Sequence, residues 1–160
     1  MFKLFKDKSL KITSPVSGEM IRIENVKDEV FSQKMMGEGV AFIPQSGNIY
    51  APVDGVLKVL FPTGHAFGIK MDNGVEIFVH IGIDTVEANG RGFEIQNIKQ
   101  GDRVRQNDLI VKTDLEHLSK NYDMTAILVV PNHGDHKISF ESCGRYSNHE
   151  TIGNIKEQVI

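Results

Sequence analysis

Apolar and polar residues alternate most regularly in the second half of the stretch from residue 65 to residue 81. Val75, Ile77, Val79 and Ile81 are all aliphatic, whereas the residues between them are glutamate, phenylalanine and histidine. A period of two is typical of a β-strand whose two faces meet different surroundings. The pattern therefore predicts a strand with one face in the core and the other on a surface that carries titratable groups.

An Asn-Gly pair divides this stretch into a predicted hairpin. Asn73 and Gly74 lie between two apolar runs, and a two-residue loop of this composition is the strongest short-range hairpin signal. With that loop, Phe67 lies opposite His80, and His65 becomes its diagonal neighbour roughly 7 to 8 Å away at the backbone. A slip of one residue would place the two imidazoles on opposite faces, whereas a four-residue loop would pair them directly.

A five-residue pattern occurs twice and indicates an internal duplication. Residues 14–18 (SPVSG) and 51–55 (APVDG) share small, Pro, Val, polar and Gly positions, and an apolar run follows each of them at 19–23 and 56–60. Further short strands follow at close spacing, which is typical of an all-β sandwich or a barrel-like core.

Two short helical segments interrupt the predicted strands. Residues 28–37 begin with acidic side chains and end at a glycine, which is enough for about two turns. Asp114 is expected to cap a helix over residues 115–120.

Composition limits the class of protein. The chain has 160 residues, a length that fits one domain. Its net charge is -3 and it has no basic stripe, which argues against nucleic-acid binding. Cys143 is the single cysteine, which excludes an intrachain disulfide and predicts a cytoplasmic location. We expect residues 1–13 to be a flexible basic tail and residues 14–160 to form a single domain. No apolar run is long enough to span a bilayer, and the tail could make at most weak membrane contact through Phe2, Leu4 and Phe5.

The two histidines of the hairpin are the main candidates for chemistry. Together with Phe67 and Phe78 they predict a shallow apolar depression with titratable groups at its floor. The alternative is that backbone carbonyls satisfy both imidazoles and that their role is purely structural. The run at 133–136 (HGDH) lacks the spacing of a metal motif and is expected to be a solvated turn, and His117 and His149 receive no functional assignment.

The motifs resemble a known family. Residues 74–86 (GVEIFVHIGIDTV) are similar to the phosphohistidine signature of the glucose-family enzyme IIA (EIIA) domain of the bacterial phosphoenolpyruvate-dependent sugar phosphotransferase system. The resemblance covers roughly residues 14–132 and implies an antiparallel β-sandwich of duplicated hybrid-motif type with short helical segments. Four other segments follow in the order of the family, namely residues 37–41, 51–55, 63–66 and 89–93.

The resemblance implies a role for each site residue. His80 would accept and donate the phosphoryl group through Nε2, with its other nitrogen held by a backbone carbonyl near Gly82. His65 would stabilise the phosphoryl oxygens, and Thr63 would orient His65. Such a phosphocarrier needs no metal and no other cofactor.

The same resemblance implies partners. Phosphorylated HPr would be the donor and a cysteine of a sugar-specific IIB domain the acceptor, coupled to a IIC permease, with regulatory proteins as further targets. The sequence identifies neither the sugar nor the IIB partner. These proteins would dock on an apolar ring with an acidic border. The ring and its border are formed by Asp28, Val30, Phe31, Met35, Met36, Phe61, Phe78, Asp84 and Val86.

Other classes of function fit the residues less well. A zinc hydrolase of similar architecture needs a His-x-His pair, but His80 is followed by Ile81 and Gly82. A biotin- or lipoyl-type module needs a lysine at the tip of a hairpin, and Lys70 lies near the tip of the predicted hairpin. This assignment, however, leaves the two histidines unexplained. A purely regulatory binding role remains open.

Overall fold

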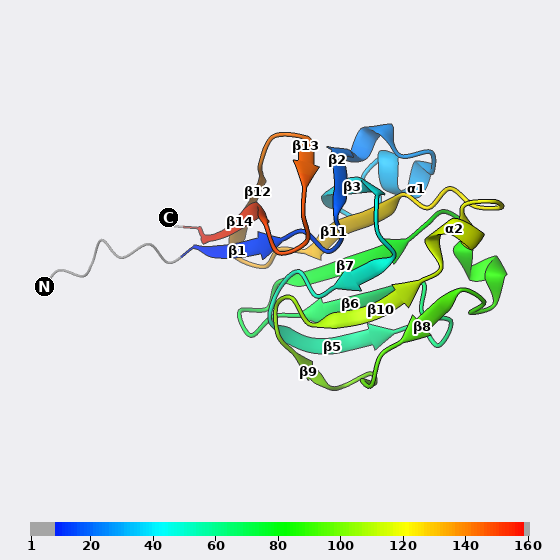
Figure 1. Ribbon diagram of the computed structural model, residues 1–160. Helices are drawn as coiled ribbons and strands as arrows, with labels where there is room; N and C mark the ends of the chain where they lie inside the picture. Colours follow the sequence, from blue (N-terminus) through cyan, green and yellow to red (C-terminus); the bar gives the residue numbers. More distant parts are fainter. Residues whose placement is uncertain (1–8, 159–160) are drawn as a thin grey trace, which may run out of the picture.

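The computed structural model describes residues 9–158, and the regular structure of this part of the chain is mostly antiparallel β-sheet (Figure 1). The strands are β1 (Leu10–Thr13), β2 (Gly18–Arg22), β3 (Glu38–Pro44), β4 (Asn48–Tyr50), β5 (Gly55–Leu60), β6 (Ala66–Lys70), β7 (Glu76–Ile81), β8 (Phe93–Ile95), β9 (Arg103–Val104), β10 (Leu109–Thr113), β11 (Ala126–Asn132), β12 (His136–Phe140), β13 (Gly144–Tyr146) and β14 (Thr151–Glu157). The helical segments are η2 (Ile23–Asn25), α1 (Glu29–Ser32), η3 (Thr85–Ala88) and α2 (Leu115–Leu118).

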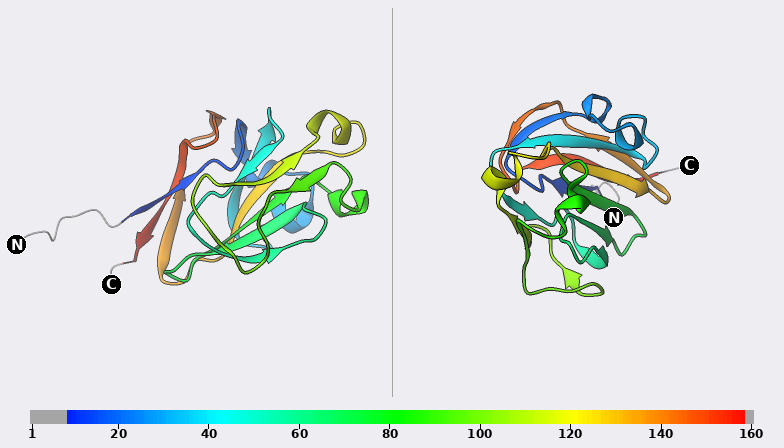
Figure 2. Two further views of the ribbon diagram at one scale, coloured as in Figure 1. Left: turned by 60° about the horizontal axis from the view of Figure 1, so that its bottom comes forward. Right: turned by 90° about the vertical axis from the view of Figure 1, so that its right-hand side faces the viewer.

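One large sheet organises the molecule. It has eight strands in the order β13-β2-β3-β11-β7-β6-β5-β9, and two three-stranded sheets, β1-β14-β12 and β4-β10-β8, complete the fold. In the right-hand view of Figure 2 the blue and cyan strands of the N-terminal part of the chain lie above the green strands that follow them in sequence. The main core lies between these layers and includes Phe42, Leu57, Phe67 and Ile77. The predicted all-β sandwich is confirmed.

The duplicated pattern forms the junction between the two halves. Tyr50 N donates to Pro15 O (2.8 Å), and Thr13 N donates to Pro52 O (3.0 Å), so each proline segment accepts a hydrogen bond from the residues that precede the other. β2 and β5 follow the two patterns, as predicted. This reciprocal arrangement is what an internal duplication produces when its two copies pack against each other.

The predicted N-terminal tail is wrong for its last residues. Leu10–Thr13 form β1, which pairs antiparallel with β14, and Ile12 is completely buried. The tail was predicted because the pairing partner lies more than 130 residues away in the sequence, where no local pattern reveals it. The rest of the predicted tail, including Phe2, Leu4 and Phe5, lies outside the described residues.

The predicted hairpin forms, but its register is shifted by one residue. Ala66, not Phe67, lies opposite His80, and Phe67 pairs with Val79 on the core face. The reason is the loop, in which Asn73 Oδ1 accepts from Val75 N (2.9 Å) and only Gly74 has a positive φ (92°). This is a three-residue connection, with a left-handed residue last, instead of a turn that needs two positive φ angles.

The helical segments are shorter than predicted. α1 is a single turn that Asp28 caps by accepting from Val30 N (2.9 Å), and Lys34 then adopts a positive φ (60°) that ends it. Asp114 caps α2 as expected, by accepting from His117 N (3.1 Å). Among residues 9–158 there is no helix with the length and hydropathy that crossing a bilayer requires.

Candidate functional site

β7 places His80 on the outer face of the large sheet. Ile77, Val79 and Ile81 are at most 1% exposed and point into the core, whereas Phe78 and His80 on the other face are partly exposed. On the same outer face, η2 and α1 cover β3 and β11 through a second apolar cluster that includes Phe31 and Ile127. The histidine therefore lies where this covering layer ends.

A turn directly after β7 fixes the orientation of the His80 ring. His80 Nδ1 donates to Gly82 O at 2.7 Å, and Gly82 has a φ of 83°, which a residue with a side chain rarely adopts. The hydrogen bond keeps the proton of the neutral imidazole on Nδ1. The Nε2 atom therefore carries the lone pair, as a nucleophilic imidazole requires.

His65 is held by a different partner. It precedes β6, directly after Gly64, whose φ is 79°, and its side chain is only 3% exposed. Its Nδ1 forms a 2.5 Å hydrogen bond with Thr63 Oγ1. If the threonine hydroxyl is the donor, the imidazole carries its proton on Nε2 and can donate it to an incoming oxygen.

The two imidazoles meet in spite of the register shift. Their ring centroids are 5.2 Å apart with an interplanar angle of 80°. Because β6 begins only at Ala66, the strict alternation of strand faces does not extend to His65. The main-chain link between the two segments is Ile81 N, which donates to His65 O at 2.7 Å.

Aromatic side chains enclose the pair. Phe31 lies against His80 with centroids 5.2 Å apart, and Phe61 contacts His65 edge-on at 5.0 Å. Phe78 bridges the two sides, at 6.4 Å from Phe61 and 6.3 Å from His80. The imidazoles therefore lie in an apolar depression, as the sequence predicts, although Phe67 is absent from it because it is buried in the core.

This environment favours the neutral form of both histidines. Burial lowers the pKa of His80 below its ordinary value of 6.5, and this outweighs the Gly82 hydrogen bond and the nearby Asp28 and Asp84, which raise it. Burial also lowers the pKa of His65, with a further contribution from the neighbouring His80. Both imidazoles are therefore uncharged at neutral pH, so that His80 keeps its lone pair available.

The predicted docking residues differ in their exposure to solvent. Met35, Val86, Val30 and Phe61 are 69, 51, 43 and 38% exposed, which is unusual for side chains of this type. Phe31 is only 5% exposed, so it supports His80 more than it offers surface. The remaining members are Met36, Phe78 and Asp28, which are partly buried, and Asp84, which is exposed.

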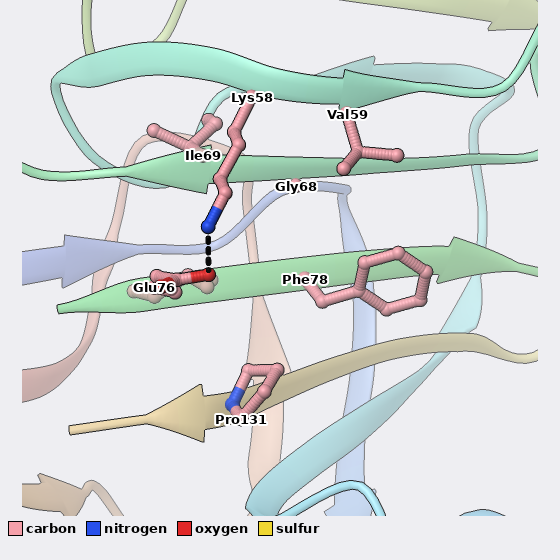
Figure 3. Close-up of a pocket in the computed structure, with 8 residues that line it drawn as sticks. Lys58, Val59, Gly68, Ile69, Glu76, Phe78 and Pro131 are labelled. Carbon is pink, nitrogen blue, oxygen red and sulfur yellow. Dashed lines mark hydrogen bonds and ion pairs between the residues drawn. The ribbon is translucent and has the colours of Figure 1, made fainter.

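A small pocket continues this apolar surface beyond Phe78. It has a volume of about 60 Å³ and is lined by Val59, Gly68 and Pro131 as well as by Phe78 (Figure 3). At one end, Lys58 Nζ forms an ion pair with Glu76 Oε1 at 3.2 Å. The pocket thus lies across four neighbouring strands, β5, β6, β7 and β11.

The other histidines lie apart from this depression. His133 is exposed in the turn before β12, as predicted, whereas His136 is half-buried and its Nδ1 has no hydrogen-bond partner within residues 9–158. In that part of the chain no cluster of three or more His, Cys, Asp or Glu side chains has a geometry that could hold a metal ion.

Comparisons with known proteins agree with this site. The family model of the phosphoenolpyruvate-dependent sugar phosphotransferase system, EIIA 1, matches residues 10–136. This chain belongs to the EIIA family. As an EIIA phosphotransferase component, it takes a phosphoryl group from HPr and passes it to a IIB domain for sugar uptake and phosphorylation.

Individual relatives extend the match beyond the family model. The chain is 44% identical over 115 residues to the glucose-specific EIIA component of Staphylococcus epidermidis, covering 72% of this chain and 69% of that protein. The glucose permease IIA of Mycoplasma capricolum superimposes with a TM-score of 0.87 and 36% identity, covering 96% of this chain and 99% of that structure. The fold of this EIIA chain after Asn132, beyond the motifs on which the sequence resemblance rests, is therefore shared as well.

Some relatives carry the EIIA unit within a longer chain. The glucose-specific EIICBA component of Streptococcus pneumoniae is 38% identical over 154 residues, which is 95% of this chain but 21% of that protein. A similar match, with 43% identity over 133 residues, is to the EIICBA component of Staphylococcus saprophyticus. In these relatives the EIIA unit belongs to the same polypeptide as IIC and IIB.

Proposed function

We propose that His80 Nε2 is the atom that carries the phosphoryl group. The observation on which this rests is the 2.7 Å hydrogen bond from His80 Nδ1 to Gly82 O, beside a second imidazole with its ring centroid 5.2 Å away. The bond fixes the tautomer, and burial keeps the ring neutral, so the lone pair on Nε2 faces the depression in which the histidines lie. A nucleophile held in one tautomer is what transfer to nitrogen requires.

In the accepting step, the Nε2 lone pair of His80 forms a bond to phosphorus while the bond from phosphorus to the donor nitrogen of HPr breaks. That nitrogen keeps the electron pair and takes up a proton from solvent. In the donating step, a cysteine thiolate of the IIB domain attacks phosphorus and the Nε2–P bond breaks. Alignment of donor, phosphorus and acceptor can lower such a barrier by about 7 to 11 kcal/mol.

His65 stabilises the phosphoryl oxygens in this scheme, and Thr63 orients it. When the Thr63 hydroxyl donates to His65 Nδ1, the proton of that ring is on Nε2, where it can be donated to a phosphoryl oxygen. Because His65 is 3% exposed, water competes little for that hydrogen bond. The predicted roles of both residues are therefore compatible with their contacts.

The exposed apolar ring is the docking surface for both partners. Val30, Met35, Phe61 and Val86 are between 38 and 69% exposed around the histidines. Asp28 and Asp84 raise the pKa of His80 and thus lie close enough to attract a basic partner at the border of the ring. A carrier that binds two proteins in turn needs a small interface, at or below about 1,200 Å².

The sugar-specific partner is a glucose-type IIB domain. Several relatives between 38 and 45% identical are named glucose-specific, and two of them contain IIB and IIC in one chain. The protein acts in the cytoplasm, where HPr and the IIB domain are accessible and where a single cysteine stays reduced.

Phosphorylation in a reconstituted system tests this assignment. Incubation with phosphoenolpyruvate, enzyme I and HPr should place acid-labile, base-stable phosphate on His80, and a panel of IIB domains should show fastest discharge to the glucose-type member. His80→Gln should abolish labelling, whereas the control His149→Gln, on a histidine that contacts Tyr50 away from the site, should not. Equal labelling of His80→Gln and the parent chain would disprove the proposal.

A further inference from the structure

The turn that follows β7 is held by contacts on both of its sides. Gly82 N donates to Thr125 O (3.0 Å), and Ile83 N donates to Asp123 O (2.8 Å), which attaches the turn to the segment before β11. On the other side, Thr85 Oγ1 donates to Ile81 O at 2.6 Å. The Gly82 carbonyl, which accepts from His80, lies between these two attachments.

Thr85 is unusual among the polar residues of the site. It is one of the few polar side chains that are buried, and its exposed fraction is 0%. The turn it closes contains two positive φ angles, 83° at Gly82 and 58° at Asp84, and the latter is uncommon for a residue other than glycine. A buried side-chain hydrogen bond across the turn can hold such a conformation in place.

The two branches of the Thr85 side chain make separate contacts. The hydroxyl binds Ile81 O, whereas the methyl group, Cγ2, would lie 2.4 Å from a Cβ atom at position 82. The methyl group therefore packs directly against Gly82, and only glycine fits there. Both branches therefore restrict Gly82, whose carbonyl faces His80 Nδ1: the hydroxyl holds the peptide group that precedes Gly82, and the methyl group packs against Gly82 itself.

We propose that Thr85 is a positioning residue for phosphoryl transfer, whose hydroxyl holds the turn that directs the Gly82 carbonyl at His80 Nδ1. This inference rests on the proposed role of His80 as phosphoryl acceptor. Thr85 touches neither imidazole through a hydrogen bond, so it acts through the turn. Without the hydroxyl, the carbonyl position is less defined and the proton of His80 is shared between Nδ1 and Nε2, which reduces the fraction of molecules with a nucleophilic Nε2.

The backbone of Ile81 extends this effect to the second histidine. Its carbonyl accepts from Thr85, and its N–H donates to His65 O at 2.7 Å. A change in the turn therefore reaches the backbone of both His80 and His65, although Thr85 itself is separated from His65 by 20 positions in the sequence.

Two substitutions separate the hydroxyl from the methyl group, and a third serves as the control. Thr85→Val removes the hydroxyl and keeps the shape, whereas Thr85→Ser keeps the hydroxyl and removes the methyl group. Thr113→Val is the matched control, because the hydroxyl of Thr113, the last residue of β10, also donates to a backbone carbonyl, Gly47 O (2.9 Å), but β10 belongs to a different sheet from β7. If Thr85→Val does not fold, Thr85→Ser and Thr85→Ala give the same comparison of a side chain with and without the hydroxyl.

Two measurements are needed, and the first does not depend on phosphotransfer. The ¹⁵N shifts of the unphosphorylated His80 ring should show a single Nδ1–H tautomer in the parent, Thr85→Ser and Thr113→Val chains, and a tautomer mixture in Thr85→Val. The pKa of His80 should also fall further in Thr85→Val, because the Gly82 hydrogen bond that raises it is weakened. The two carboxylates that raise the pKa of His80, Asp28 and Asp84, and the neighbouring imidazole of His65 are unchanged in every variant.

The second measurement is the rate at which phosphorylated HPr labels His80. We expect a decrease of about 10- to 100-fold in Thr85→Val, recovery in Thr85→Ser and no change in Thr113→Val. An unaltered tautomer and rate in folded Thr85→Val, or equal losses in the valine and serine variants, would refute the positioning role. Absence of label from His80 in the parent chain would instead refute the proposed function, and the ¹⁵N shifts would still decide whether Thr85 controls the tautomer.

Discussion

The two faces of β7 show how one strand serves stability and chemistry through alternate residues. Ile77, Val79 and Ile81 are at most 1% exposed and pack into the main core. Phe78 and His80, between them in sequence, lie on a surface that only η2 and α1 partly cover. Aliphatic side chains on the first face restrict the backbone, and this restriction lets the second face hold an imidazole in one orientation. Substitutions on the two faces should therefore have separable effects.

The largest expected effect is on the core face. Ile77→Ala should lower the free energy of unfolding by about 2 to 5 kcal/mol, because it removes buried methylene and methyl groups and leaves a cavity. Urea denaturation measures the change. The folded fraction should still be labelled on His80, and a loss below about 1 kcal/mol would mean that the core face contributes less than its burial indicates.

On the other face, His65→Gln should separate the two half-reactions. Replacing the His65 imidazole with a neutral amide leaves the hydrogen bond from His80 Nδ1 to Gly82 O in place, so His80 should still accept the phosphoryl group from HPr. Donation to the IIB domain should fall by about 100-fold, because the hydrogen bond to the phosphoryl oxygens is lost. Rapid-quench measurements of each half-reaction test this, and equal loss in both would contradict the division of roles between the histidines.

A smaller effect is expected at the rim of the docking surface. Val86 is 51% exposed, and Val86→Ser should raise the KM for HPr roughly fivefold through the loss of about 1 kcal/mol of apolar contact, with kcat unchanged. Leu10→Ser is a suitable control, since Leu10 is 46% exposed but belongs to β1, in a different sheet from the histidines. If the two variants behave alike, the apolar ring is not the docking surface.

The smallest expected effect is on the pH dependence of stability. Both histidines have a lowered pKa in the folded chain, so the unfolded chain binds more protons below about pH 6.5. Stability should be constant above that value and should decrease as the pH falls from 6.5 through the lowered folded pKa values. Urea midpoints measured between pH 5 and 8 should show that stability falls less at acid pH in His80→Gln than in the parent chain. An unchanged slope would indicate that His80 titrates normally in the folded chain.

Local patterns predicted much of the fold and of the site. The period of two identified the buried face of β7, the cap at Asp114 forms as expected, and the helical turn expected after the acidic start at Asp28 is present. These features depend on side chains a few positions apart, so the sequence is sufficient to reveal them. The roles of the histidines were implied by the family resemblance, and the contacts of Thr63 and Gly82 are compatible with those roles.

Three features became visible only in the structure. The register of the β6–β7 hairpin was set by the Asn73 side chain, which accepts from Val75 N and lengthens the loop by one residue. β1 formed because β14 provides its partner. Thr85 was part of the recognised motif, but its role became visible only with its burial and its bond to Ile81 O. A threonine directly after Gly-Ile-Asp was the only signal that the sequence offered.

The sequence by itself determined the strand faces, the caps and the histidine pair, because side-chain periodicity and turn chemistry act over a few neighbouring residues. Only the tertiary structure decided that the two imidazoles meet, that burial keeps them neutral and that aromatic side chains from α1, β7 and the β5–β6 loop surround them. Burial and pKa are properties of the whole assembled environment. They arise when strands distant in the sequence pack together and exclude water from the same site.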